Sequence, residues 1–179
     1  MKKITQILGL GILFLFATTL SLSAQKCKFD YNKKDPITGE ATKGNTVTIS
    51  KIVFVATNNY NWKLGFHRAG DSYHVGVSLE GYGNFRERIQ KGDPITFVLS
   101  NGEIVTINSQ DEFLPTARAA QVVVTEYKGK YDIDVAALQK IAENPPTFIR
   151  MNIESKVYEK EINSATGKQI AQAARCILQ

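Results

Sequence analysis

The chain has 179 residues, of which 43% are hydrophobic and 22% are charged, with 13 Gly, 5 Pro and a formal net charge of +5. This composition excludes a disordered tail, a collagenous repeat and a disulfide-dense miniprotein. A single globular domain remains, and a chain of this length can bury a self-sufficient core.

The first 24 residues are typical of a secretory signal peptide. Met1-Lys2-Lys3 is a short positive segment, an apolar run follows, and small residues lead to an expected cleavage after Ala24 or after Ser23. The alternative is a retained membrane anchor, but the apolar run is short for a span of about 20 residues. We therefore expect a periplasmic or secreted protein with no membrane span after signal removal.

Removing the signal peptide takes away two lysines and no acidic residue, which lowers the net charge from +5 to +3. The remaining lysines and arginines are scattered among acidic residues. A nucleic-acid-binding protein concentrates its basic residues on one face, so the sequence argues against a nucleic-acid partner.

Cys27 and Cys176 are the only two cysteines, and they lie at opposite ends of the mature chain. In an exported protein this pair predicts one disulfide bond that pins both termini. Two free thiols, or a reactive Cys27 used on a partner, are the alternatives, but neither cysteine belongs to a C-x-x-C motif.

The N-terminal half reads as a polar segment followed by strands. Residues 25–45 are rich in turn-forming residues and predict a surface arm. Residues 46–57 are dense in β-branched side chains and predict a buried strand. Residues 60–67 and 72–79 alternate apolar and polar side chains, which predicts a half-buried hairpin with a four-residue loop.

Two further hairpins are predicted downstream. Residues 95–100 and 103–108 flank Asn101-Gly102, a pair typical of two-residue type I′ turns. Both faces of this hairpin are apolar, so we expect it at the centre of a two-layer packing. Residues 121–127 and 131–135 predict another hairpin with its turn at Lys128-Gly129.

The C-terminal third mixes helices with strands. Apolar residues recur at helical spacing over 135–143, and Pro145-Pro146 follow that helix. Residues 148–153 and 157–162 alternate as strands. Asn163 or Ser164 can cap a last helix that carries Cys176 near its end.

Together these elements predict a mainly β (α+β) fold in one domain over residues 46–179. We expect an antiparallel β-sandwich or partly closed barrel of seven or eight strands, with a short helix near 135–143 and a C-terminal helix.

Motifs of the common hydrolases and metalloproteins are missing from the sequence: it has no H-E-x-x-H, no G-x-S-x-G, no metal-spaced cysteine pair and no EF-hand loop. The sequence therefore gives no support for catalysis and predicts no cofactor, although catalytic groups can converge from separate strands.

His67 and His74 are the only histidines, and the predicted hairpin brings them together. A four-residue loop would pair His67 with residue 72 and make the two imidazoles diagonal neighbours, at a distance that permits a shared metal. Zinc sites need at least three protein ligands, and neither Asp71 nor Glu80 is well placed as a third. We expect a solvated sheet face, with the two histidines as a weak metal candidate only.

The glycine-rich connection over 80–88 offers a second candidate site. Tyr82 and Phe85, bracketed by Arg86 and Arg88, could form a stacking platform for an anionic or sugar ligand. The alternative is that Phe85 closes the end of the core and Tyr82 covers it. The aromatic residues that alternate along the preceding hairpin, Tyr60, Trp62, Phe66 and Tyr73, are expected in the core.

Four short runs of the sequence carry a resemblance: Lys91-Gly92-Asp93-Pro94-Ile95, Ser100-Asn101-Gly102-Glu103, Phe148-Ile149-Arg150 and Ala174-Arg175-Cys176-Ile177-Leu178. They resemble small exported proteins of unknown function from Gram-negative bacteria. The resemblance implies the periplasm or secretion and carries over no catalytic residues. We expect a non-catalytic binding or envelope-associated module that contacts an unknown protein or envelope component. The alternative is a small periplasmic hydrolase or metal-dependent enzyme whose site is assembled from separate strands.

Overall fold

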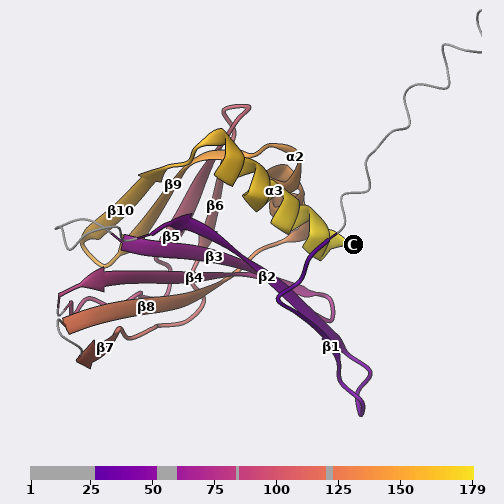
Figure 1. Cartoon of the computed structure of the whole chain (residues 1–179), viewed down its shortest axis with the longest axis horizontal. Helices are drawn as coiled ribbons and strands as arrows, with labels where there is room; N and C mark the ends of the chain where they lie inside the picture. Colours follow the sequence, from indigo (N-terminus) through magenta and orange to yellow (C-terminus); the bar gives the residue numbers. More distant parts are fainter. Residues whose placement is uncertain (1–26, 52–59, 84, 120–122) are drawn as a thin grey trace, which may run out of the picture.

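The computed structural model describes residues 27–51, 60–83, 85–119 and 123–179 (Figure 1). The expected signal peptide, the end of the strand predicted over 46–57 and the start of the strand predicted over 121–127 lie outside the described residues.

Two antiparallel sheets form the body of the molecule (Figure 1). The first sheet is curled and has six strands, which lie in the order β1 (Tyr31–Lys34), β2 (Ala41–Ser50), β3 (Tyr60–Ala69), β4 (Ser72–Tyr82), β8 (Val123–Asp132) and β7 (Thr116–Ala119). The second sheet has four strands, in the order β10 (Lys156–Glu161), β9 (Pro146–Ile153), β5 (Pro94–Leu99) and β6 (Ile104–Asn108). The predicted mainly β fold is confirmed.

Ten strands occur in the described part of the chain, compared with the seven or eight predicted. The additional strands, β1 and β7, are four residues each, are exposed throughout and lie at the two edges of the curled sheet. The region expected as a polar arm contains β1 and the start of β2, so the strands begin at Tyr31 instead of near Thr46. Together β1 and β2 form a hairpin that projects from the body (Figure 1).

The core lies between the facing sides of the two sheets and beneath the helices. Strict alternation along β3, β4 and β5 turns every second side chain inward, where Leu64, Phe66, Val75, Ile95 and Phe97 are completely buried. Of the four aromatic residues predicted in the core, Trp62 and Phe66 are buried, whereas Tyr60 and Tyr73 are only partly buried and pack against it.

Both predicted helices are present: α2 (Val135–Glu143) and α3 (Ser164–Leu178). Asp134 caps α2 by accepting a hydrogen bond from the Ala137 amide, and Asn163 caps α3 by accepting one from the Thr166 amide. The α3 helix packs against α2, β2, β3 and β9. Neither helix of the described residues combines the length and apolar character that crossing a bilayer requires.

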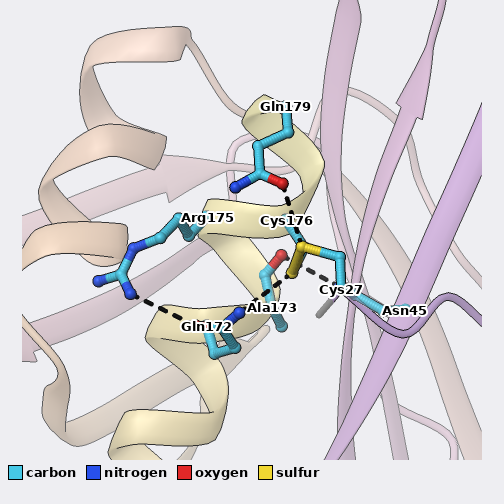
Figure 2. Close-up of a disulfide and its surroundings, with 7 residues drawn as sticks. All are labelled: Cys27, Asn45, Gln172, Ala173, Arg175, Cys176 and Gln179. Atoms are coloured by element: carbon cyan, nitrogen blue, oxygen red, sulfur yellow. Dashed lines mark hydrogen bonds between the residues drawn. A yellow bond between two sulfur atoms is a disulfide. The ribbon is translucent and has the colours of Figure 1, made fainter. Parts of the chain in front are cut away.

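The predicted disulfide between Cys27 and Cys176 is confirmed, with 5.5 Å between the two Cα atoms (Figure 2). It attaches the segment before β1 to the last turn of α3. Nearby, the Gln172 side-chain amide donates to Cys176 Sγ over 3.3 Å, and the Asn45 amide of β2 donates to the Ala173 carbonyl over 3.1 Å. Covalent and hydrogen-bonded links therefore hold the C-terminal helix on the curled sheet.

The first predicted hairpin has a tighter turn than expected. A two-residue connection, Gly70-Asp71, replaces the four-residue loop, because Gly70 adopts a φ of +56°. The register consequently moves, and His67 pairs directly with His74.

The hairpin around Asn101-Gly102 is present, but its predicted turn type and position are wrong. The Gly102 amide donates to the Leu99 carbonyl and the Leu99 amide to the Glu103 carbonyl, and only Gly102 of this turn has positive φ. This is a three-residue connection with a bulge, so Val98 pairs with Ile104. Strand β6 lies at a sheet edge, and its Ile104 side chain is 64% exposed.

The predicted turn at Lys128-Gly129 is also wrong, because β8 runs straight through both residues. Gly129 faces inward, where the Ile89 side chain occupies the space that a Cβ would need, with Ile89 Cδ1 2.8 Å from that position. The glycine permits close packing in a strand instead of a reversal of the chain.

Candidate functional site

A cleft of about 560 Å³ lies where the curled sheet and the four-stranded sheet meet at the β3–β10 end. Ten of the described residues line it: Ser50, Lys51, Tyr60, Trp62, Phe85, Lys156, Val157, Tyr158, Glu159 and Lys160. Its volume is within the range of small-molecule sites in proteins. Residues at its floor are buried and those at its rim are exposed, so the cleft opens to solvent.

Aromatic side chains form the floor. Trp62 is 2% exposed and Tyr158 is 5% exposed. The Tyr60 ring meets the Tyr158 ring edge-on, with 5.0 Å between centroids, and the buried Tyr127 ring lies 6.2 Å from Tyr158. Edge-to-face contacts of this kind fix ring orientations, which gives the floor a defined shape.

A β-bulge in β2 contributes to one wall. The pairing register of β2 with β3 changes by one residue here, because Thr48 pairs with Lys63 but Ser50 pairs with Trp62. The shift turns Ser50 toward the cleft, and its hydroxyl donates to the Tyr60 carbonyl over 2.7 Å. Bulges commonly re-aim side chains in this way next to binding sites.

The opposite wall comes from β10, through the two-residue period of a strand. Tyr158 faces the core, so Lys156 and Lys160 lie on the same side of the strand as Tyr158. A buried aromatic ring is therefore flanked by two lysines in the cleft.

Phe85 is held at the cleft by the buried Thr125 of β8. Thr125 Oγ1 accepts a hydrogen bond from the Phe85 amide over 3.2 Å and donates one to the Gly83 carbonyl. Lys156 Nζ lies 4.9 Å from the centre of the Phe85 ring, a cation–π contact. The same lysine is 2.6 Å from a Glu87 carboxylate oxygen and lowers the pKa of Glu87 by hydrogen bonding.

Two lysines at the cleft have no carboxylate partner. No Asp or Glu of the described residues lies within ion-pair distance of Lys51 or Lys160, and every Asp and Glu of the chain is among the described residues. The carboxylate of Glu159 is already paired with Arg150, 2.6 Å away. The cleft consequently carries unbalanced positive charge.

Among the described residues, two polar atoms at the floor find no hydrogen-bond partner: Trp62 Nε1 and the Tyr158 hydroxyl oxygen. Both are closed to solvent. Burial raises the pKa of Tyr158 to about 12, so this hydroxyl stays protonated at neutral pH. Buried donors without partners are uncommon in folded proteins, and each costs about 1–3 kcal/mol.

The four candidate residues of the 80–88 connection do not converge on one site. Phe85 lines the cleft, whereas Tyr82 lines a neighbouring hollow on the outer face of the curled sheet, and Lys51 borders both. Arg86 is exposed, and Arg88 pairs with Glu112 at 2.6 Å and with Glu154 at 3.5 Å. A common stacking platform is therefore not formed.

The two histidines lie closer than expected, with ring centroids 5.8 Å apart. His67 Nδ1 is hydrogen-bonded at 2.9 Å to the hydroxyl of Tyr31 from β1. Within the described part of the chain, no group of three or more His, Cys, Asp or Glu residues is arranged to hold a metal ion. His67 thus connects β1 to the outer face of the sheet, and His74 lies beside it.

Sequence reasoning placed Tyr60 and Trp62 in the core and missed the cleft. The missing partners, Lys156, Tyr158 and Lys160, lie about 100 residues further along the chain, on the other sheet. A usable signal was the lysine–tyrosine–lysine alternation in β10, which places cations beside an inward aromatic residue.

Comparison of this chain with protein families, with curated proteins and with solved structures found no match.

Proposed function

We propose that the protein is an exported, non-catalytic binding module that holds a small organic ligand in the cleft between its two sheets. The observation that carries the proposal is the cleft itself, a space of about 560 Å³ floored by Trp62 and Tyr158 and rimmed by lysines. Aromatic lining with a few polar groups is the usual character of a small-molecule site.

Export is supported by two features. The N-terminal sequence has the charge, apolar run and small residues of a signal peptide. The Cys27–Cys176 disulfide is typical of proteins that fold in an oxidising compartment. Fractionation of cells that express the full chain should place the processed, non-reduced protein in the periplasm or the medium; an unprocessed, thiol-containing cytoplasmic protein would contradict export.

Trp62 gives a direct test of binding because it is the only tryptophan of the chain and lines the cleft. The purified protein should change its tryptophan fluorescence, with saturation, when titrated with compounds from a panel of small aromatic molecules. Bound compounds should be recovered chemically unchanged after long incubation, since we propose binding without turnover.

A pair of tyrosine variants locates the binding. Tyr60→Ala removes a ring from the cleft, and Tyr82→Ala removes a comparably half-buried ring from the outer face. We expect the first variant to weaken binding and the second to leave it unchanged. Equal effects of the two variants would reject the cleft as the site.

A further inference from the structure

We infer that the cleft selects an organic anion with an aromatic body, such as an aromatic carboxylate or sulfonate. This inference rests on the proposed function, because it assigns the chemical class of the ligand that the cleft would hold. Three properties of the described residues carry it: the aromatic floor, the unpaired lysines and the excess of hydrogen-bond donors.

The floor favours a flat aromatic body. Tyr60, Trp62, Phe85 and Tyr158 all line the cleft, and the Tyr60 and Tyr158 rings are fixed against each other. Rings fixed in this way offer faces and edges to a planar ligand without first losing conformational freedom. An aromatic ligand could also make a cation–π contact with Lys156, which already makes one with the Phe85 ring.

The charge at the rim favours an anion. Lys51, directly after β2, and Lys160 of β10 both line the cleft, and neither has a carboxylate of the described residues within ion-pair distance. A bound carboxylate or sulfonate between them would gain charge-assisted hydrogen bonds without breaking an existing ion pair.

The same charges disfavour a cationic ligand. Glu159, which lines the cleft, and Glu87, which contacts the cleft residue Lys156, are already paired: Glu87 with Lys156 and Glu159 with Arg150, each at 2.6 Å. A cation would have to displace a lysine or an arginine to reach either of them. A neutral ligand would leave Lys51 and Lys160 unpaired.

The polar atoms without partners at the floor also favour a ligand that accepts hydrogen bonds. The indole nitrogen of Trp62 can only donate, and the Tyr158 hydroxyl stays protonated at neutral pH. Both atoms are closed to solvent, so a ligand reaches them only if it parts the side chains above them. A ligand acceptor that reaches Trp62 Nε1 or the Tyr158 hydroxyl would accept a hydrogen bond from a donor that has no partner among the described residues.

Two probes that share one aromatic body separate charge from shape. 8-Anilinonaphthalene-1-sulfonate carries a sulfonate, and N-phenyl-1-naphthylamine has the same rings without it. Each is titrated into the purified, non-reduced protein, where energy transfer from Trp62 reports binding and the variants below locate it. We expect the sulfonate to bind roughly tenfold more tightly than the neutral probe, an effect equivalent to two partly exposed charge contacts.

Two double variants test which charges are responsible. Lys51→Gln/Lys160→Gln removes the unpaired lysines of the cleft. Lys63→Gln/Lys130→Gln removes two exposed lysines on the outer face of the curled sheet, which also have no ion-pair partner among the described carboxylates. Only the first variant should weaken binding of the sulfonate, by roughly tenfold, and it should leave the neutral probe unaffected. Thermal unfolding of both variants checks that each is folded.

The outcomes separate the two proposals. Equal affinity for the two probes, or a loss of sulfonate binding in the outer-face variant alone, would overturn the anionic ligand while leaving a ligand-binding cleft. Absence of energy transfer from Trp62 with both probes would overturn the binding cleft itself. Sulfonate preference that disappears with Lys51 and Lys160 supports the inference.

Discussion

The imidazole of His67 lies over Gly65 two residues earlier on the same strand, so that an alanine Cβ at position 65 would come within 2.5 Å of His67 Nε2. All three nearest atoms to that Cβ position belong to His67. Gly44 and Gly76, on the two neighbouring strands, likewise leave room for this ring. The outer face of the sheet is therefore shaped to receive one histidine.

We predict that the effect of Gly65→Ala on stability changes sign with residue 67. In the wild-type background the alanine displaces the imidazole and its hydrogen bond to Tyr31, which should lower the free energy of unfolding by about 1 kcal/mol. In a His67→Ala background the clash is gone, and the alanine should stabilise the strand by about 0.5–1 kcal/mol. Urea denaturation of the four proteins gives the coupling, and additive effects would contradict the prediction.

Acid should destabilise the fold through the histidine pair. Burial lowers the pKa of both His67 and His74 below the ordinary value of 6.5, and for His74 the charges of Lys130 and His67 act in the same direction. The unfolded chain therefore binds protons more readily than the folded one as the pH falls below about 6.5, and stability decreases in that range.

The measurement is the urea midpoint at several pH values between about 7.5 and 5.5, where histidine is the side chain that titrates. The His67→Gln/His74→Gln variant should have a flatter profile over the same interval, whatever its absolute stability. An equal slope in both proteins would show that other groups are responsible.

Thr125→Val should disturb both stability and the cleft. The substitution keeps the shape of the side chain but removes the acceptor for the Phe85 amide and the donor to the Gly83 carbonyl. Buried groups without partners cost about 1–3 kcal/mol, which thermal unfolding can detect. Thr116→Val, at an exposed position of β7, is the matched control and should change stability by less than about 0.5 kcal/mol.

The disulfide should contribute strongly to stability. Cys27→Ser opens a loop with a sequence separation of 149 residues and should lower the free energy of unfolding by about 2–5 kcal/mol. Reductant should lower the unfolding temperature of the wild-type protein and have no effect on the variant. A wild-type protein insensitive to reductant, with complete reduction verified by mass spectrometry, would argue against this contribution.

Local signals predicted the helices better than the turns. The start of α3 was predictable because Asn163 can satisfy an amide in the first turn of the helix itself. Gly129 was misread because a glycine that marks a turn and one that admits a neighbouring side chain look alike in sequence. The difference lies in Ile89, which arrives from another part of the chain.

The cleft could not be predicted from local sequence patterns, because it is formed by contacts between strands that are distant in the sequence. Trp62 follows the alternation of a core strand and is indeed buried, so its position was predictable. That its ring also borders an open space depends on how β10 of the second sheet is placed against β3. The bulge before Ser50 has the same origin, since it arises from the register between β2 and β3.

The link between Cys27 and Cys176 also determines how the protein bears mechanical load. A force that pulls on residue 27 and on the C-terminal Gln179 passes through the sulfur–sulfur bond and the last three residues of the chain, bypassing both sheets. The oxidised domain should therefore transmit tension between residues 27 and 179 as a short, nearly inextensible element, and the strands should extend under such a load only after reduction.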